Sequence, residues 1–276
     1  MMVDHQLGEA WLENCATPEQ LCFFREEGYL IVPDALPPDV LERTIAAADE
    51  VALAESTHTR NPDPLKPELD ILTSTFRTVS RHDAFLDLLD VPKTFPLLWD
   101  VSRARPLVLA WWGGALSYAT SSPPGTALIL RLAAQMLGWN IQLYISHLIV
   151  YPPEPVDAPR KQVGAGWHID GGRPVWEMEE RPQPRLSLKI GYFLTDTTIP
   201  ECGAMRIVPR SHLEGAPPAA RAAGVDPEGA MELKVKAGTA VFFDRRLHHS
   251  RGYNYSDRTR KVIFMGFSYR WMRGLD

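Results

Sequence analysis

The sequence has few cysteines and no excess of positive charge. Its 276 residues contain three cysteines, Cys15, Cys22 and Cys202, which are odd in number and form no Cys-x-x-Cys pair. A disulfide framework is therefore disfavoured, and we expect free thiols in a reducing compartment, the cytoplasm. Lysine and arginine number 29 against 34 acidic residues, which gives a net charge of −5 at pH 7. This balance argues against nucleic acid or an anionic membrane as the main partner.

Long hydrophobic runs and internal repeats are also missing. The apolar run Leu107–Ala119 is too short to span a bilayer, and Leu132–Tyr151 is interrupted by polar residues such as Gln135 and His147. The N-terminus has an early acidic residue, Asp4, and no apolar core, so we expect no signal peptide. No period of 20–50 residues repeats, which argues against a solenoid or a propeller.

The first part of the chain has the pattern of helices around one short strand. Thr17–Gln20 is a capping box with proline at the first helical position, and Gly28 is a stop signal for that helix. A short β run follows at Tyr29–Val32, and Pro37-Pro38 opens a second helix. Further helices are expected at Ala84–Leu89, Pro96–Arg103 and Thr126–Leu137.

After Asn140 the chain consists of short runs rich in β-branched and aromatic residues. Such runs, separated by turn residues, predict an antiparallel sandwich or barrel rather than parallel βαβ units. We therefore expect one α+β domain over residues 1–276, with a helical part over about 1–139 and a β core over about 140–273. The predicted strands are Ile141–Tyr151, Leu186–Leu194, Met205–Val208, Glu232–Val235, Thr239–Phe243 and Lys261–Tyr269.

The segment Gly166–Gly172, with the sequence GWHIDGG, carries the sharpest chemical pattern. On a strand, His168 and Asp170 would share one face and could bind a metal ion together. A second histidine would complete a facial triad with three open coordination positions, which suits non-haem Fe(II) and O₂. His-x-Asp alone is a weak signal. The second histidine must come from far along the chain, where His248 and His249 end a β run.

Two arginines, Arg258 and Arg260, follow these histidines at the mouth of the next strand. If the intervening turn closes a hairpin, a guanidinium returns near the metal and could hold a ligand carboxylate bidentately. The alternative is an exposed basic loop that Asp244 and Asp257 neutralise.

Together these pieces resemble the phytanoyl-CoA dioxygenase family. The resemblance rests on the His-x-Asp segment, the opening strand Gly28–Pro33, the run Cys202–His212 and the pattern Phe-Asp-x-x-x-His-His…Asn-x-Ser-x-x-x-Arg over residues 243–260. It covers most of residues 17–271 and is weakest at 62–125 and 214–228. It implies a double-stranded β-helix (a jelly-roll or cupin-like fold) with the N-terminal helices packed on it.

The resemblance also implies a set of metal ligands. His168 and Asp170 match the first two ligands of the family. The family places an asparagine five residues after the third ligand, and Asn254 therefore selects His249. His248 is then expected to face outward from the strand.

Three further residues are matched to 2-oxoglutarate. Arg260, which opens the final strand, matches the arginine with which the family binds 2-oxoglutarate. Arg258 is the reserve for that role, because some relatives use a shorter spacing. Gln142 stands where members often contact 2-oxoglutarate.

The implied function is that of an Fe(II)- and 2-oxoglutarate-dependent dioxygenase that consumes O₂ and oxidises a C–H bond. Hydroxylation of a small, mostly apolar molecule, such as a secondary metabolite, is the leading expectation. Halogenation is disfavoured because Asp170 fills a position that halogenating enzymes leave to Gly or Ala. The alternatives are an acyl-CoA hydroxylase and a metal-binding β-barrel that only binds or isomerises its ligand.

Two segments are expected to gate the substrate. Gly171–Arg185 directly follows the metal ligands and carries Trp176 and Met178. The insert Pro106–Gly125, with Trp111, could form the other wall of an apolar pocket. The alternative is that both segments are only surface packing.

Overall fold

The computed structural model describes residues 16–56, 73–89, 91, 93, 141–161, 163–170, 184–214 and 225–273. The expected helices Pro96–Arg103 and Thr126–Leu137, the insert Pro106–Gly125 and nearly all of Gly171–Arg185 lie outside these residues.

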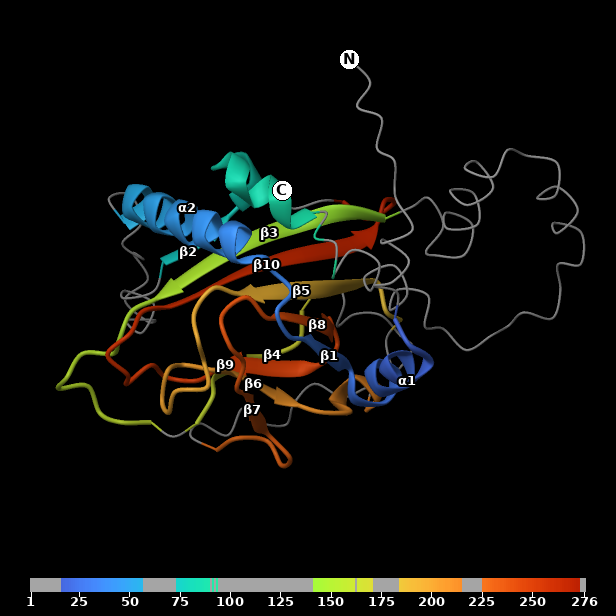
Figure 1. Cartoon of the computed structure of the whole chain (residues 1–276). Coiled ribbons are helices and arrows are strands. Elements are labelled where there is room, and N and C mark those ends of the chain that lie inside the picture. The colour runs from blue at the N-terminus through green and yellow to red at the C-terminus, as the bar shows by residue number, and fades with distance from the viewer. Residues whose placement is uncertain are drawn as a thin grey trace, which may run out of the picture.

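Within the described residues, the strands form two antiparallel sheets (Figure 1). The larger sheet has the order β1-β8-β5-β10-β3-β2, and the smaller has the order β4-β9-β6-β7. The strands are β1 (Tyr29–Val32), β2 (Thr73–Phe76), β3 (Ile141–Tyr151), β4 (Ala165–His168), β5 (Ser187–Phe193), β6 (Met205–Val208), β7 (Met231–Leu233), β8 (Ala240–Asp244), β9 (His248–Arg251) and β10 (Arg260–Tyr269).

The chain crosses repeatedly from one sheet to the other between β3 and β10. β3, β5, β8 and β10 belong to the larger sheet, and the strands between them belong to the smaller. This alternation produces a double-stranded β-helix, or jelly roll, and confirms the expected α+β fold class. The predicted strands agree with the observed ones to within one or two residues, whereas β2, β4 and β9 were not among them.

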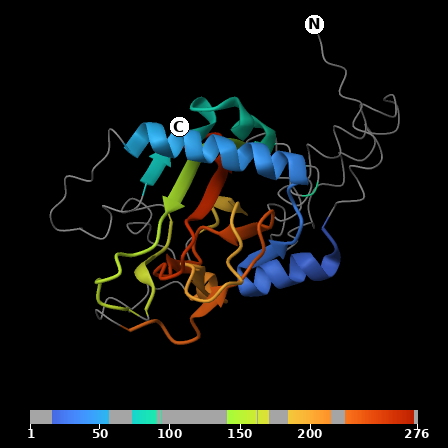
Figure 2. The same ribbon diagram turned by 60° about the vertical axis from the view of Figure 1, so that its left-hand side comes forward.

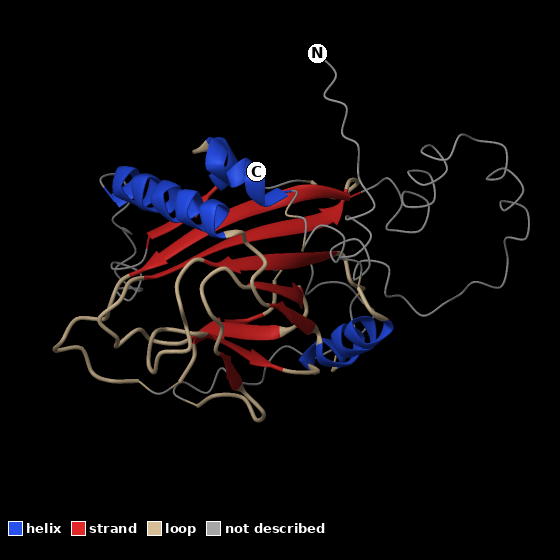
Figure 3. Ribbon diagram, in the orientation of Figure 1, coloured by secondary structure: helices blue, strands red, loops and turns tan. Residues whose placement is uncertain are grey.

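The helices lie outside the two sheets (Figure 3). Helix α1 (Pro18–Glu27) begins at the predicted capping box, where the Thr17 hydroxyl accepts from the Gln20 amide at 3.2 Å and the Gln20 side chain accepts from the Thr17 amide at 2.9 Å. It ends at Gly28, whose φ of 83° lies in the left-handed region. Helix α2 (Pro38–Ser56) covers the β2–β3 end of the larger sheet (Figure 2).

Short 3₁₀ helices complete the described structure: η3 (Thr78–Ser80), η4 (Asp83–Leu89) and η6 (Ser211–Leu213). The helix expected at Ala84–Leu89 is therefore confirmed in position but has 3₁₀ geometry. None of the described helices is both long enough and apolar enough to span a bilayer.

The larger sheet separates two apolar clusters. Alternate residues of a strand point to opposite faces, so Phe242 packs under the helices while Phe243 packs between the sheets. Ile263 and Phe264 divide in the same way on β10. Met205, Phe243 and Phe264 of the second cluster also line a cavity.

Candidate metal centre

His168, Asp170 and His249 converge at one end of the smaller sheet. His168 is the last residue of β4, and His249 is its register partner on the neighbouring strand β9. The two imidazole centroids lie 4.3 Å apart. One ligand atom from each histidine and one carboxylate oxygen of Asp170 all lie within 4.8 Å of one another. The structure therefore brings together the three residues that the sequence selects.

Both histidines present the same nitrogen to this centre. Nδ1 of His168 lies 2.7 Å from the carbonyl oxygen of Gly166, and Nδ1 of His249 lies 2.8 Å from that of Leu247. A carbonyl oxygen only accepts, so Nδ1 carries the proton and Nε2 keeps a lone pair for a metal. Burial, followed by the neighbouring His168, lowers the pKa of His249 to about 3, which keeps its imidazole neutral at neutral pH.

Asp170 lies just beyond the end of β4, and its carboxylate has one engaged and one unengaged oxygen. Oδ1 accepts from Lys189 Nζ at 2.7 Å. Oδ2 is buried without a hydrogen-bond partner among the described residues and lies 3.9 Å from His249 Nε2. Burial by itself would raise the pKa of Asp170, but the Lys189 ammonium, followed by the interactions with the two histidines, outweighs burial and lowers that pKa to about 2.

The donor set fits a divalent transition metal. Two neutral imidazole nitrogens and one carboxylate oxygen are the ligands of the two-histidine, one-carboxylate class, which leaves positions open for other ligands. The unpartnered Asp170 Oδ2 supports this fit, because a buried carboxylate oxygen without a donor is costly unless a cation compensates it.

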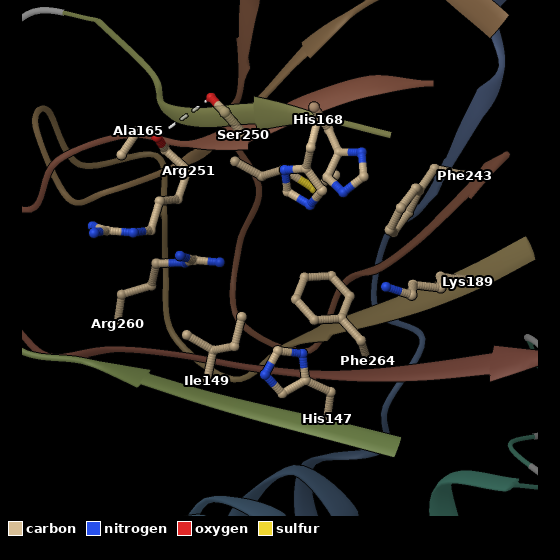
Figure 4. A pocket seen from close by; sticks show the side chains of 12 residues that line it. His147, Ile149, Ala165, His168, Lys189, Phe243, Ser250, Arg251, Arg260 and Phe264 are labelled. Atoms are coloured by element: carbon tan, nitrogen blue, oxygen red, sulfur yellow. Dashed lines mark hydrogen bonds between the residues drawn. The ribbon is translucent and has the colours of Figure 1, made fainter. Parts of the chain in front are cut away.

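A cavity of about 210 Å³ adjoins the triad (Figure 4). Its apolar walls include Ile149, Met205, Phe243 and Phe264. Three cationic side chains also line it: Lys189 lies at one end, and Arg251 and Arg260 lie at the other (Figure 4). The cavity is thus apolar in its middle and has cationic side chains at both ends.

Arg260 is buried in this cavity with only 3% of its surface exposed. Its Nε and Nη1 have no hydrogen-bond partner among the described residues. Burial, and then the charge of Arg251, lower the pKa of Arg260 to about 10, so the guanidinium stays charged at neutral pH. Arg251 has an acidic neighbour, since its Nη1 lies 3.9 Å from Glu154 Oε1. A buried cation with two unpaired donors calls for an anionic ligand.

The structure does not bring the other two candidates for 2-oxoglutarate to the cavity. The Arg258 side chain is 66% exposed, with its Nε 3.9 Å from Asp257. The Gln142 amide donates to the carbonyl oxygen of Met272 at 2.6 Å. Of the three candidates, Arg260 alone lies among the described residues that line the cavity.

The turn between the histidines and the arginines does not close a hairpin. β9 belongs to the smaller sheet and β10 to the larger, so residues 252–259 cross between sheets. Asn254, which is fully buried, fastens this crossover by donating to the carbonyl oxygens of Tyr151 at 3.0 Å and Arg258 at 2.8 Å. The crossover, rather than a hairpin, brings Arg260 to the cavity that His249 lines.

His248 lies on the opposite face of β9 from His249, as strand alternation requires. It is not exposed, however: 5% of its surface is accessible, and its amide donates to the Ser211 hydroxyl of η6 at 2.8 Å. His248 thus lies on the face expected for it, and its contact with η6 accounts for its burial.

Sequence reasoning missed Lys189 and Arg245. Lys189 is the single charged residue of the buried strand β5, SLKIGYF, and a charge within an apolar run is a signal that could have found it. Arg245 is 1% exposed and donates to the carbonyl oxygens of Asp170 and Pro184 at 3.2 and 2.9 Å. Nothing in the local sequence distinguishes Arg245 from its neighbour Arg246.

The fold and the site define a cupin-like protein with a candidate mononuclear metal centre. The family model for phytanoyl-CoA dioxygenase (PhyH) matches residues 24–262, and the chain belongs to this family. A comparison with curated protein sequences finds no match.

Several solved structures share the fold. The non-haem α-ketoglutarate-dependent carbocyclase SnoK from nogalamycin biosynthesis is 20% identical, with a TM-score of 0.56 over 92% of this chain and 84% of that one. HygX from Streptomyces hygroscopicus, solved with nickel and 2-oxoglutarate, is 14% identical, with a TM-score of 0.61 over 95% and 90%. EctD from S. alaskensis, solved with 2-oxoglutarate and 5-hydroxyectoine, is 19% identical, with a TM-score of 0.59 over 92% and 76%. At these identities the similarity establishes the fold alone.

Proposed function

We propose that this protein is an Fe(II)- and 2-oxoglutarate-dependent oxygenase that oxidises a C–H bond of a small molecule. The proposal rests on two side chains at the same cavity, each of which has buried polar atoms without a hydrogen-bond partner among the described residues. Asp170 Oδ2 lacks a donor beside two imidazoles, and Arg260 lacks an anion at the far end of the same cavity. Membership of the phytanoyl-CoA dioxygenase family supports the proposal. HygX and EctD, which share the fold, were crystallised with 2-oxoglutarate.

His168, Asp170 and His249 would hold the ferrous ion through two Nε2 atoms and Oδ2. When bound, the ion supplies activation of O₂ coupled to oxidative decarboxylation of 2-oxoglutarate. The chain's own part is to orient both imidazoles, because the Gly166 and Leu247 carbonyl oxygens accept from Nδ1 and leave Nε2 directed at the ion.

Arg260 would bind the carboxylate of 2-oxoglutarate that lies away from the metal. A guanidinium can donate to both oxygens of one carboxylate, and the Nε and Nη1 of Arg260 have no other partner among the described residues. With Lys189 and Arg251 also lining the cavity, the site is complementary in charge to a dianion.

The substrate would be small and mostly apolar. Ile149, Met205, Phe243 and Phe264 line the cavity and would keep water from the reacting centre. His168 is the most exposed of the three ligand residues, so its side of the centre is where substrate would approach. An acyl-CoA thioester remains the alternative substrate class.

Hydroxylation is the leading outcome, and ring closure is the second candidate. The observation that favours ring closure is the structural similarity to the carbocyclase SnoK. A reducing, cytoplasmic setting is part of the proposal, because ferrous iron persists there and Cys22 is an exposed free thiol.

The test is succinate formation by protein loaded anaerobically with Fe(II) and then mixed with 2-oxoglutarate and O₂. We expect slow succinate release that requires all three components, and faster release with an accepted apolar substrate. Tightly bound zinc without any 2-oxoglutarate turnover would instead favour the metal-binding β-barrel.

A further inference from the structure

Lys189 is a buried cation directed at the candidate metal centre. It is the third residue of β5, where it pairs with Phe243 of β8 and Gly266 of β10. Every residue of this strand is buried, and Lys189 itself is 8% exposed. A lysine in such a place is costly unless a partner compensates its charge.

The partner of Lys189 is Asp170, and the contact is selective for one carboxylate oxygen. Nζ lies 2.7 Å from Oδ1, and both side chains are close to fully buried. Oδ2 is left without a donor and is the oxygen nearer to His249. The Asp170 main chain is held separately by Arg245, through its carbonyl oxygen and its guanidinium.

We propose that Lys189 is a positioning residue of the metal centre. It occupies Oδ1, so that Asp170 offers only Oδ2 to the ion, and it adds a positive charge that weakens ion binding but strengthens binding of the anionic co-substrate. This inference rests on the proposed function and assigns to Lys189 a part in it.

The first half of the inference follows from coordination. A carboxylate free at both oxygens can bind an ion through both, and would then take up a position that the co-substrate or O₂ needs. With Oδ1 engaged by Lys189, Asp170 contributes one donor atom and the open positions stay open.

The second half follows from charge. With both histidines neutral, the formal charges of the Asp170 carboxylate and the Lys189 ammonium sum to zero, so a divalent ion brings the charge of the site to +2. Without Lys189 the sum is −1, and the loaded site reaches only +1. Replacing Lys189 with a neutral residue should therefore raise the affinity for the divalent ion. The repulsion between the ammonium and the ion is removed, and the negative charge of Asp170 then has no cationic partner until the ion binds. The same replacement should lower the affinity for a dianion such as 2-oxoglutarate.

The test compares Lys189→Met with Lys261→Met, using Mn(II) as a probe. Lys261 on β10 also makes an ion pair, with Nζ 2.6 Å from the half-exposed Asp49, but does not line the cavity. Calorimetric titration should show that Lys189→Met binds Mn(II) about tenfold more tightly than wild type. The Mn(II)-loaded variant should bind 2-oxoglutarate about tenfold more weakly. Lys261→Met should change neither affinity.

Thermal unfolding gives a second readout. Metal-free Lys189→Met should melt below metal-free Lys261→Met, and Mn(II) should raise its melting temperature by more than it raises that of wild type. If Lys189→Met does not fold, Lys189→Gln removes the charge while keeping a donor, and the same opposite shifts in the two affinities are expected.

Two results would overturn the inference. Weaker binding of Mn(II) in the variants, or unchanged affinities for both Mn(II) and 2-oxoglutarate, would reduce Lys189 to a structural neutraliser of Asp170. The failure of the proposed function looks different, since the wild-type protein itself would then fail to bind 2-oxoglutarate or to convert it to succinate.

Discussion

Arg245 and Asp170 form two reciprocal hydrogen bonds, although they lie far apart in the sequence. The Asp170 amide donates to the Arg245 carbonyl oxygen at 2.8 Å, and Arg245 Nη1 donates back to the Asp170 carbonyl oxygen at 3.2 Å. Because Asp170 lies two residues beyond His168, the end of β4, no sheet ladder orients it. The loop after β8 therefore fixes a metal-ligand candidate that belongs to the loop after β4.

Replacing Arg245 with Met should loosen the candidate metal centre and the fold together. Two hydrogen bonds from a buried charged donor are lost, each worth about 1.5–3 kcal/mol, so the free energy of unfolding should fall by about 3 kcal/mol. Urea unfolding measures this loss, and Mn(II) titration should show weaker binding. Arg160→Met, at an exposed ion pair with Glu201, is the control and should change stability by less than about 1 kcal/mol.

Replacing His249 should remove metal binding, whereas replacing His248 should not. His249→Ala deletes an Nε2 donor that faces Asp170, while His248 lies on the other face of β9. Metal content after anaerobic loading with Fe(II), measured per folded chain, separates the two variants. A metal-free His248→Ala beside a loaded His249→Ala would reverse the proposed assignment.

Replacing Arg260 should weaken 2-oxoglutarate binding far more than replacing Arg258. A bidentate, charge-assisted pair is worth about 1.5–3 kcal/mol, so Arg260→Ala should raise the dissociation constant roughly ten- to hundredfold. Arg258 is exposed and outside the cavity, and Arg258→Ala should leave the constant within about twofold. Calorimetry on Mn(II)-loaded protein measures both. Equal effects of the two substitutions would contradict the role of Arg260.

The metal-free protein should lose stability as pH falls from about 6.5, and His147 should account for part of that loss. Burial, and then the charge of Lys189, lower the pKa of His147 to about 3. The unfolded chain therefore binds this proton at a higher pH than the folded chain does, and the stability is present above the unfolded pKa of about 6.5. It falls with decreasing pH down to about 3, by at most about 1.4 kcal/mol per pH unit for one group.

His147→Phe tests this linkage. The His147 ring stacks on Phe76 with centroids 4.1 Å apart, and phenylalanine preserves that contact while losing the hydrogen bond to Ser74. Urea unfolding at pH 7 and pH 5 should show a smaller pH-dependent loss in the variant than in wild type. An undiminished loss would mean that other groups carry the whole effect.

Local patterns in the sequence determined most of the elements. The predicted bounds of β3 and β6 agree with the observed ones, because β-branched and aromatic residues in short runs bounded by turn residues report directly on strands. The capping box at Thr17 and the stop at Gly28 delimit α1, since these signals act within a few residues. His168 and Asp170 are close together in the sequence, so their proximity could be predicted without the fold.

Only the tertiary structure decided which residues from distant segments come into contact. β9 and β10 look like a hairpin in sequence, but the fold sends them into different sheets, and this crossover brings Arg260 to the cavity of His249. Lys189 is visible in the sequence as a charge in a buried strand, yet its partner, Asp170, follows from how β5 lies against the end of β4. Arg245 reaches Asp170 for the same reason. Contacts between residues so far apart along the chain depend on sheet packing and register, which no local pattern contains.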